Sequence, residues 1–408
     1  MDETSVRRLL ETAIGDEPPM GAVARNSLRA GIKLRRRARI RRAAGGAAVA
    51  IVFAAAVPAV IGTLPNTPAP PHHAPRPPGP WVPPSGTAYV INSGGGTVTP
   101  IDLATSTAEK PIDVSGEPVA MTIAPDGTTA YVAIGFTSSR TSAQGVQPID
   151  LATNTAGKPI DLQWPPDATV ITPDGKTAYS INGFPSLTVT PIDLATNRPG
   201  KPIKLSEWPQ AIAMAPDGKA YVGIETDSMT SHGSRAAYDF MSLDLATGRL
   251  GKPVKISGEP EDIAITPNGK TAYVTIFSSG TVTPINLSAN KAGKPIKISG
   301  NPPGKNFTGI PFAIAITPDG KTAYVTDGAS GAVTPIDVAT NKPGKPIKIS
   351  GKPGSDAIAI SADGTTAYVA NQPSSTVTPI YLATGTPEKP IRFGHGWDSG
   401  FEAIAVVP

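Results

Sequence analysis

One short motif recurs seven times in this chain of 408 residues, and the repetition constrains the fold more than any other feature. The motif is Ala-Tyr, usually within Thr-Ala-Tyr-Val, and its copies lie 42 to 52 residues apart. Repeats of this length are typical of β-propellers and solenoids, in which each repeat forms one small sheet. The seven tyrosines are Tyr89, Tyr131, Tyr179, Tyr221, Tyr273, Tyr324 and Tyr368.

Each repeat contains four runs, here named a to d, that are expected to form β-strands. A Pro-Asp-Gly turn or a close variant joins runs a and b, since proline presets the first turn position and glycine supplies the left-handed one. Asp-Leu-Ala-Thr-Asn or a variant joins runs c and d, and its first residue is expected to accept hydrogen bonds from the turn amides. We therefore interpret as structural the aspartates Asp102, Asp150, Asp193, Asp244 and Asp337.

The composition of the runs predicts their order in each sheet. Run a is apolar with no charge at its centre, as in a buried inner strand. Run d begins with Lys-Pro in every repeat, which is typical of an exposed edge strand. Run c carries a proline in six repeats, Pro100 for example, and we expect a β-bulge there because proline cannot donate to a ladder.

The two ends of the repeat region complement each other. Residues 402–408 are an a run with no b run after them, and residues 85–89 begin a b run with no a run before them. Joined, they complete one sheet and close the ring. The predicted fold class is all-β, a seven-bladed β-propeller with four-stranded antiparallel blades and one blade shared by both ends.

The segment before the repeats predicts a membrane anchor. Residues 1–42 hold eleven basic and five acidic residues, and residues 43–64 follow without a charge, enough for one transmembrane helix. The basic cluster places the N-terminus in the cytoplasm. A proline-rich stalk at 65–84 would then carry the propeller, 85–408, outside the cell membrane. A signal peptide cleaved near Ala59 or Ala69 is the alternative, and it exports the repeats as well.

Composition excludes several functions. The chain has no cysteine, which removes disulfides, thiol nucleophiles and thiolate metal sites. Outside residues 1–42 the net charge is −2, and anionic lipid accounts for the basic tail, so no nucleic-acid partner is expected. Serine-hydrolase, zincin and phosphate-loop motifs are absent.

Only one face of the expected propeller varies in length between repeats. The c-to-d spacing is always 11 residues, whereas b-to-c runs from 12 to 22 and d-to-a from 13 to 22. These two variable connections emerge on the same face, the usual binding face of repeat folds. The candidate binding residues there are Trp164, Asp167, Trp208, His232, Tyr238, Glu261, Asp262, Phe307, Asp356, His395, Trp397 and Glu402.

Each kind of candidate also has an ordinary structural interpretation. The aromatic residues mark either a binding surface or packing between blades. The two histidines are either haem or metal ligands or solvated loop residues. The acids at the start of run a either ring the mouth of the central channel, where they could hold Ca²⁺ or raise one carboxyl pKa, or are ordinary rim residues. Catalytic and metal-ligating residues stay unassigned, and no cofactor is expected, with Ca²⁺ as the ion considered.

The repeat resembles the YVTN family of β-propeller repeats. The matching residues are Tyr-Val-Ile-Asn at 89–92, Tyr-Val-Ala-Asn at 368–371 and Ile-Asp-Leu-Ala-Thr at 101–105, 149–153 and 192–196. It departs from the pattern at Ile134, Ile224 and Ile276, and at the prolines of run c. The resemblance implies an exported seven-bladed propeller and says little about chemistry, while the tail, span and stalk look actinobacterial.

Two functions follow as hypotheses. The first is a monomeric, non-enzymatic binding module whose variable face contacts an extracellular protein, peptide or glycan. The alternative is a lactonase-like hydrolase with metal-binding acids at the channel mouth. Convergence of those acids within coordinating distance would favour the enzyme.

Overall fold

The computed structural model describes residues 86–135, 144–183, 186–230, 233–298, 311–349, 354–371, 374–393 and 403–407. For residues 227–230, 233–236 and 355–356 only the backbone is described. The tail, span and stalk expected before residue 85 lie outside these residues. Within the described ranges, no helix is long and apolar enough to cross a membrane.

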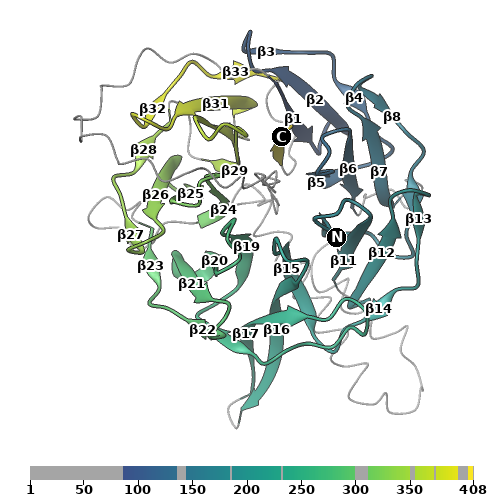
Figure 1. Cartoon of the computed structure of the whole chain (residues 1–408), viewed down its shortest axis with the longest axis vertical. Helices are drawn as coiled ribbons and strands as arrows, with labels where there is room; N and C mark the ends of the chain where they lie inside the picture. Colours follow the sequence, from purple (N-terminus) through teal and green to yellow (C-terminus); the bar gives the residue numbers. More distant parts are fainter. Residues whose placement is uncertain are drawn as a thin grey trace, which may run out of the picture. The chain divides into compact units, whose positions relative to one another are not determined.

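The described residues form seven antiparallel sheets, which confirms the seven-bladed propeller (Figure 1). The innermost strands contact one another in a closed cycle. In blade order, 1 to 7, they are β34 (Ile404–Val406), β5 (Pro118–Ile123), β10 (Ala168–Ile171), β15 (Trp208–Met214), β19 (Pro260–Ile265), β24 (Pro311–Ile316) and β29 (Ser355–Ile360).

The second and third strands of each blade pair along their length and hold most of the core. The second strands are β1 (Thr87–Asn92), β6 (Thr129–Ile134), β11 (Thr177–Asn182), β16 (Ala220–Thr230), β20 (Thr271–Ile276), β25 (Thr322–Asp327) and β30 (Thr366–Asn371). The third strands are β2 (Thr97–Asp102), β7 (Gly145–Asp150), β12 (Thr188–Asp193), β17 (Gly233–Leu243), β21 (Thr281–Asn286), β26 (Ala332–Asp337) and β31 (Thr376–Tyr381). A short 3-10 helix, η1 (Phe277–Ser279), joins β20 to β21.

The outer strand is split into two short pieces in every blade but the fourth. The pieces are β3 (Thr107–Ala108) and β4 (Ile112–Asp113), β8 (Thr155–Ala156) and β9 (Ile160–Asp161), β13 (Arg198–Pro199) and β14 (Ile203–Lys204), β22 (Lys291–Ala292) and β23 (Ile296–Lys297), β27 (Lys342–Pro343) and β28 (Ile347–Lys348), and β32 (Thr386–Pro387) and β33 (Ile391–Arg392). Blade 4 has a single outer strand, β18 (Val254–Ile256).

The split explains the prolines of the third strand. In blade 1, Pro100 pairs in regular register with Tyr89, so the inner ladder is unbroken. The carbonyl of Pro100 accepts from the amide of Glu109 at 2.8 Å, which places the proline nitrogen on the same, outer side. There the register shifts by one residue between β3 and β4. The expected bulge is confirmed, but the extra residue belongs to the outer strand.

The ring closes as the two ends of the repeat region predicted. Strand β34 pairs antiparallel with β1, with Ala88 opposite Val406. The amide of Ile91 donates to Ala403 at 2.9 Å, and that of Val407 donates to Thr87 at 3.0 Å. Blade 1 therefore combines the first and last strands of the repeat region.

The aspartates of the c–d turns have the structural role expected of them. Asp150 accepts from the amide and the hydroxyl of Thr153, both at 2.8 Å, and these hydrogen bonds hold the pKa of its carboxyl below the usual value. Asp102, Asp193, Asp244 and Asp337 accept turn amides in the same way. These carboxylates fix the turns, and no reaction chemistry needs to be assigned to them.

Candidate functional site

The variable connections lie on one face of the propeller, here called the loop face, and the longest described one is in blade 4. Strands β16 and β17 each have eleven residues and pair from Ala220 with Leu243 to Thr230 with Gly233. Neighbouring strands accompany this hairpin only as far as Glu225 and Tyr238. The remainder projects from the ring as a two-stranded ribbon (Figure 1). The sequence indicated only a long b-to-c connection at this position.

Two sequence-predicted candidates, Asp167 and Trp208, meet where blades 3 and 4 adjoin, and a third, Trp164, contacts the adjacent Asn182. Asp167 accepts the amide of Gly183 at 2.7 Å through Oδ2. A Cβ on Gly183 would lie 2.5 Å from that oxygen and 2.7 Å from Nε1 of Trp208, so only glycine fits between them. Trp164 is tied to the same point because its carbonyl accepts from the Asn182 amide group at 2.8 Å. We call these five residues the blade 3–4 cluster.

The exposure of the blade 3–4 cluster suits a binding surface. Trp164 is 36% exposed and is the one large hydrophobic side chain so classified among the described residues. Asp167 is exposed and Trp208 is half-buried. By contrast, Asn182 is buried and accepts at Oδ1 from the hydroxyl of Thr190 at 3.1 Å. The buried, hydrogen-bonded Asn182 therefore lies beneath the exposed indole of Trp164 and the exposed carboxylate of Asp167.

Blade 4 extends the cluster along its rim. Trp208 lies opposite Glu225, which lies opposite Tyr238 on the next strand. The Glu225 side chain is only 6% exposed, and its Oε2 accepts from the Gln210 amide group at 3.3 Å. Sequence reasoning missed Asn182, Gly183, Gln210 and Glu225. The position of Asn182 at the end of a Tyr-x-x-Asn motif was the signal that could have identified it.

The two acidic candidates in blade 5 are buried in the structure. Asp262 is 2% exposed, and its carboxylate accepts the amides of Ile263 at 2.8 Å and Ile314 at 2.9 Å. Ile314 belongs to blade 6, so this carboxylate joins two blades. Burial raises the pKa of Asp262 to about 7, although the two amides oppose the shift. The neighbouring Glu261 is 6% exposed.

The remaining candidates lie outside the part of the chain whose side chains are described. They are His232, Phe307, Asp356, His395, Trp397 and Glu402. Among the side chains that are described, no group of three or more acidic or histidine residues is placed to hold a metal ion. The convergence of acids that would favour the enzyme is therefore not found in this part of the chain.

Comparison with known proteins gives likeness of structure only. No family model and no curated protein sequence matches the chain. Among solved structures, hydrazine synthase of Kuenenia stuttgartiensis is 23% identical with a TM-score of 0.62, over 73% of this chain and 93% of that one. A putative 6-phosphogluconolactonase from Bacteroides uniformis is 16% identical with a TM-score of 0.60, over 79% and 100% of the two chains. The periplasmic gluconolactonase of Pseudomonas aeruginosa is 15% identical with a TM-score of 0.60, over 79% and 99%. At these identities the likeness supports the same conclusion as the strand pairing, that the chain folds as a seven-bladed β-propeller.

Proposed function

We propose that this protein is a binding module that recognises its ligand through the blade 3–4 cluster. The observation that carries the proposal is the convergence of Asp167 and Trp208 on Gly183, with the exposed Trp164 joined to the neighbouring Asn182 through its carbonyl, on the face where the repeats differ in length. A rigid sheet that presents aromatic and polar groups on variable connections is a common arrangement for recognition.

The charge of the cluster restricts its ligand. Asp167 is an exposed carboxylate, and the indoles of Trp164 and Trp208 can stack on a flat or cationic group. Lysine or arginine side chains of a peptide satisfy this combination, as do the ring faces and hydroxyls of a glycan. An extracellular protein, peptide or glycan is therefore the proposed partner, and nucleic acid is disfavoured because the exposed Asp167 carboxylate repels phosphate.

We also propose that the propeller is held outside the cell membrane by a single helix at residues 43–64. The support is the uncharged span itself, with the basic residues of 1–42 before it and the prolines of 65–84 after it. Membership of the YVTN repeat family, an actinobacterial type of chain and a monomeric state complete the proposal. A protease-protection assay on membrane vesicles tests the topology, because the proposal requires the propeller and the tail to lie on opposite sides.

The binding proposal is tested with the full chain in detergent. Binding would be screened on arrays of glycans and of lysine-rich peptides, and the hits compared between wild type and Trp164→Ala. Because Trp164 is exposed, the substitution should leave folding intact while weakening binding roughly tenfold or more. Lys219→Ala is the matched control, since this exposed residue follows an a–b turn on the opposite face. Unchanged binding in Trp164→Ala would refute the assignment of the site.

Lactone hydrolysis is the second candidate, and the neighbours named as gluconolactonases favour it. It would require acids at the channel mouth with a divalent ion, of which Ca²⁺ is the ion proposed. The test measures hydrolysis of gluconolactone and 6-phosphogluconolactone by the full chain with Ca²⁺ and with a chelator. Rates equal to the uncatalysed reaction under both conditions would eliminate this candidate.

A further inference from the structure

The outer strands of four consecutive blades carry the same pattern of basic residues. Arginine or lysine occupies the first, fourth and seventh positions of four seven-residue segments, and no acidic residue lies within them. The segments are 198–204 in blade 3, 249–255 in blade 4, 291–297 in blade 5 and 342–348 in blade 6. All twelve of these cationic residues are exposed, and we call them the basic belt. They are nearly half of the basic residues that lie outside 1–42.

The four segments follow one another along the outer wall of the ring (Figure 1). Strand β18 of blade 4 contacts β22 of blade 5, and β23 of blade 5 contacts β27 of blade 6. Blades 3 and 4 adjoin at Gly248, where an added Cβ would lie 3.1 Å from the carbonyl of Lys204. Between blades 4 and 5, the Asn290 side chain donates to the carbonyl of Lys252 at 3.0 Å. The basic belt is therefore one continuous surface on a convex wall.

Protection of the edge strand explains only the middle lysine of each segment. That lysine precedes a proline and is present in all seven blades. The third cation is different, because Asp113 and Asp161 occupy its position in blades 1 and 2. At the position of the first cation, blades 1, 2 and 7 have threonine. Since a charge of either sign hinders edge pairing, the gathering of one sign in four neighbouring blades needs another explanation.

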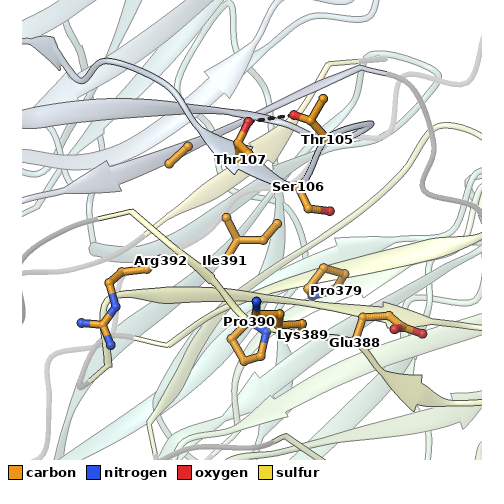
Figure 2. A pocket seen from close by; sticks show the side chains of 10 residues that line it. Thr105, Ser106, Thr107, Pro379, Glu388, Lys389, Pro390, Ile391 and Arg392 are labelled. Carbon is orange, nitrogen blue, oxygen red and sulfur yellow. Dashed lines mark hydrogen bonds between the residues drawn. The ribbon is translucent and has the colours of Figure 1, made fainter.

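The belt ends at the boundary between blades 7 and 1. Blade 7 has Lys389 and Arg392, but Glu388 directly precedes the lysine. Figure 2 shows Glu388 beside Lys389, and across the boundary the uncharged turn residues 105–107 of blade 1. The outer strand of blade 1, at 107–113, then has two acidic residues and one lysine. The outer wall therefore loses its positive charge on leaving the belt.

Neighbouring acids neutralise only part of the belt. On the adjoining third strand, the third cation of blades 3, 5 and 6 lies opposite a threonine or an alanine. In blade 4 this cation is Lys255, whose Nζ lies 2.9 Å from Oδ2 of Asp239. No other ion pair within the described ranges involves the belt. The first cation lies opposite an aspartate of the c–d turn in blades 3 and 6. The positive charge therefore comes chiefly from the second and third cations.

The spacing of the cations favours a linear polyanion over a single small anion. Successive cations within a segment are three residues apart, which is roughly 10 Å in an extended chain. A small anion would therefore meet one exposed ammonium group at a time, and salt screens such single contacts. A polymer with a charge on each repeating unit can contact many cations together, so that weak contacts add up to stable binding.

We propose that the basic belt binds a linear anionic polysaccharide, which follows the outer wall from blade 3 to blade 6. Its carboxylate, sulfate or phosphate groups pair with the lysines and arginines, and its sugar rings pass over the prolines between them. The choice of a polysaccharide among polyanions rests on the proposed position of the propeller outside the cell. The site itself lies on the outer wall and does not depend on the blade 3–4 cluster.

Two other anionic partners fit the belt less well. A membrane is flat, so its lipid headgroups would reach only a small part of a convex wall at once. Single-stranded nucleic acid is generally held by aromatic side chains that stack on its bases, and none of the four segments contains an aromatic residue. Duplex DNA has a persistence length of about 500 Å, so it would pay bending energy to follow the wall.

Titration of the full chain in detergent with polygalacturonate, followed by calorimetry at two salt concentrations, tests the proposal. Lys204→Asp, Lys297→Asp and Lys348→Asp are combined in one variant. These substitutions introduce the residue that blades 1 and 2 carry naturally, so the fold should persist, as circular dichroism would show. Binding should weaken roughly tenfold or more in this variant, and in the wild type it should weaken as salt rises.

The matched control changes the net charge equally at another place. Lys176→Asp, Lys270→Asp and Lys321→Asp are combined at exposed positions of the a–b turns, and binding should stay within about twofold of the wild type. The basic residues of 1–42 are present in every variant, so differences between variants report on the belt. Asp113→Lys with Asp161→Lys should tighten binding, because it extends the belt into blades 1 and 2.

Three results would each overturn the proposal: no binding of polygalacturonate, equal weakening in both triple variants, or equal affinity for monomeric galacturonic acid. Tighter binding of anionic lipid vesicles or of oligothymidine than of polygalacturonate would refute the choice of polysaccharide. Trp164→Ala should bind polygalacturonate as the wild type does. This variant separates a failure of the belt from a failure of the blade 3–4 cluster.

Discussion

Replacing Ser106, in the c–d turn of blade 1, by asparagine should stabilise the boundary between blades 7 and 1. Ser106 corresponds to Asn154 in the c–d turn of blade 2, whose Oδ1 accepts from the Tyr89 hydroxyl of blade 1 at 2.7 Å. The Tyr368 hydroxyl of blade 7 is buried and has no hydrogen-bond partner among the described residues, and the new carboxamide would accept from it. A new hydrogen bond contributes about 1 kcal/mol, and relief of a buried unsatisfied hydroxyl can raise the gain to about 3 kcal/mol. The backbone already has φ of 55°, a conformation that asparagine tolerates well, so no strain offsets the gain.

Urea unfolding of the full chain, followed by circular dichroism, measures this effect. Ser106→Asn should raise the free energy of unfolding by about 1–3 kcal/mol, and Asn154→Ser should lower it by a similar amount. The same substitution in a Tyr368→Phe background isolates the hydrogen bond, because the phenylalanine has no hydroxyl to donate. If Ser106→Asn stabilises equally in both backgrounds, or in neither, the bridging carboxamide is not the cause.

Three further predictions follow from buried contacts. Because burial raises the pKa of Asp262 to about 7 from 3.8, the folded state keeps a proton that the unfolded state has lost. The free energy of unfolding should therefore fall, by roughly 4 kcal/mol, as pH rises from about 4 to about 7. Asp262→Asn should remove this part of the pH dependence, and an identical profile in wild type and variant would contradict it. Gly183→Ala should lower the urea midpoint and weaken ligand binding, since its Cβ would meet Asp167 and Trp208 within 2.7 Å; unchanged values for both would argue against the cluster. Tyr273→Phe should lower the free energy of unfolding by about 1 kcal/mol in the same assay, because it removes the hydrogen bond from the Tyr273 hydroxyl to Asn341 of blade 6. An unchanged free energy of unfolding would show that such contacts do not hold blades together.

The ring could be predicted from the sequence because each repeat encodes its own turns. The aspartates of the c–d turns act within five residues of sequence, and Asp150 makes the contacts that its motif predicts. Closure of the ring could also be predicted from the sequence, since the unpaired a run and the unpaired b run can complete a blade only by pairing with each other. The proline of run c was read correctly as a bulge signal, but only the structure shows that the outer strand carries the extra residue.

The candidate site was harder to predict because it is assembled from different blades. Trp208 of blade 4 lies beside Gly183 of blade 3. The spacing of residues within one repeat gives no information about a contact between two blades. Asp262 was expected near the channel mouth, yet the register of β19 shifts between Pro260 and Ile263 and its carboxylate bonds to blade 6. The sequence shows that blade 1 carries Ser106 where blade 2 carries Asn154, but only the structure shows that the Tyr368 hydroxyl of blade 7 is buried without a hydrogen-bond partner among the described residues.

The pairing of β34 with β1 also sets an order of events during synthesis. Strand β1 leaves the ribosome early, but its inner partner lies more than 300 residues later, so blade 1 stays incomplete until the last strand has emerged. At elongation rates of about 5–20 residues per second, the exposed edge of β1 would wait for tens of seconds. Closing a loop of that length costs several kcal/mol of chain entropy, which the three residue pairs of β34 and the docking of blade 7 on blade 1 must offset together. Until then the propeller is an open arc in which the inner edge of β1 is unpaired, and the ring closes when β34 pairs with this edge.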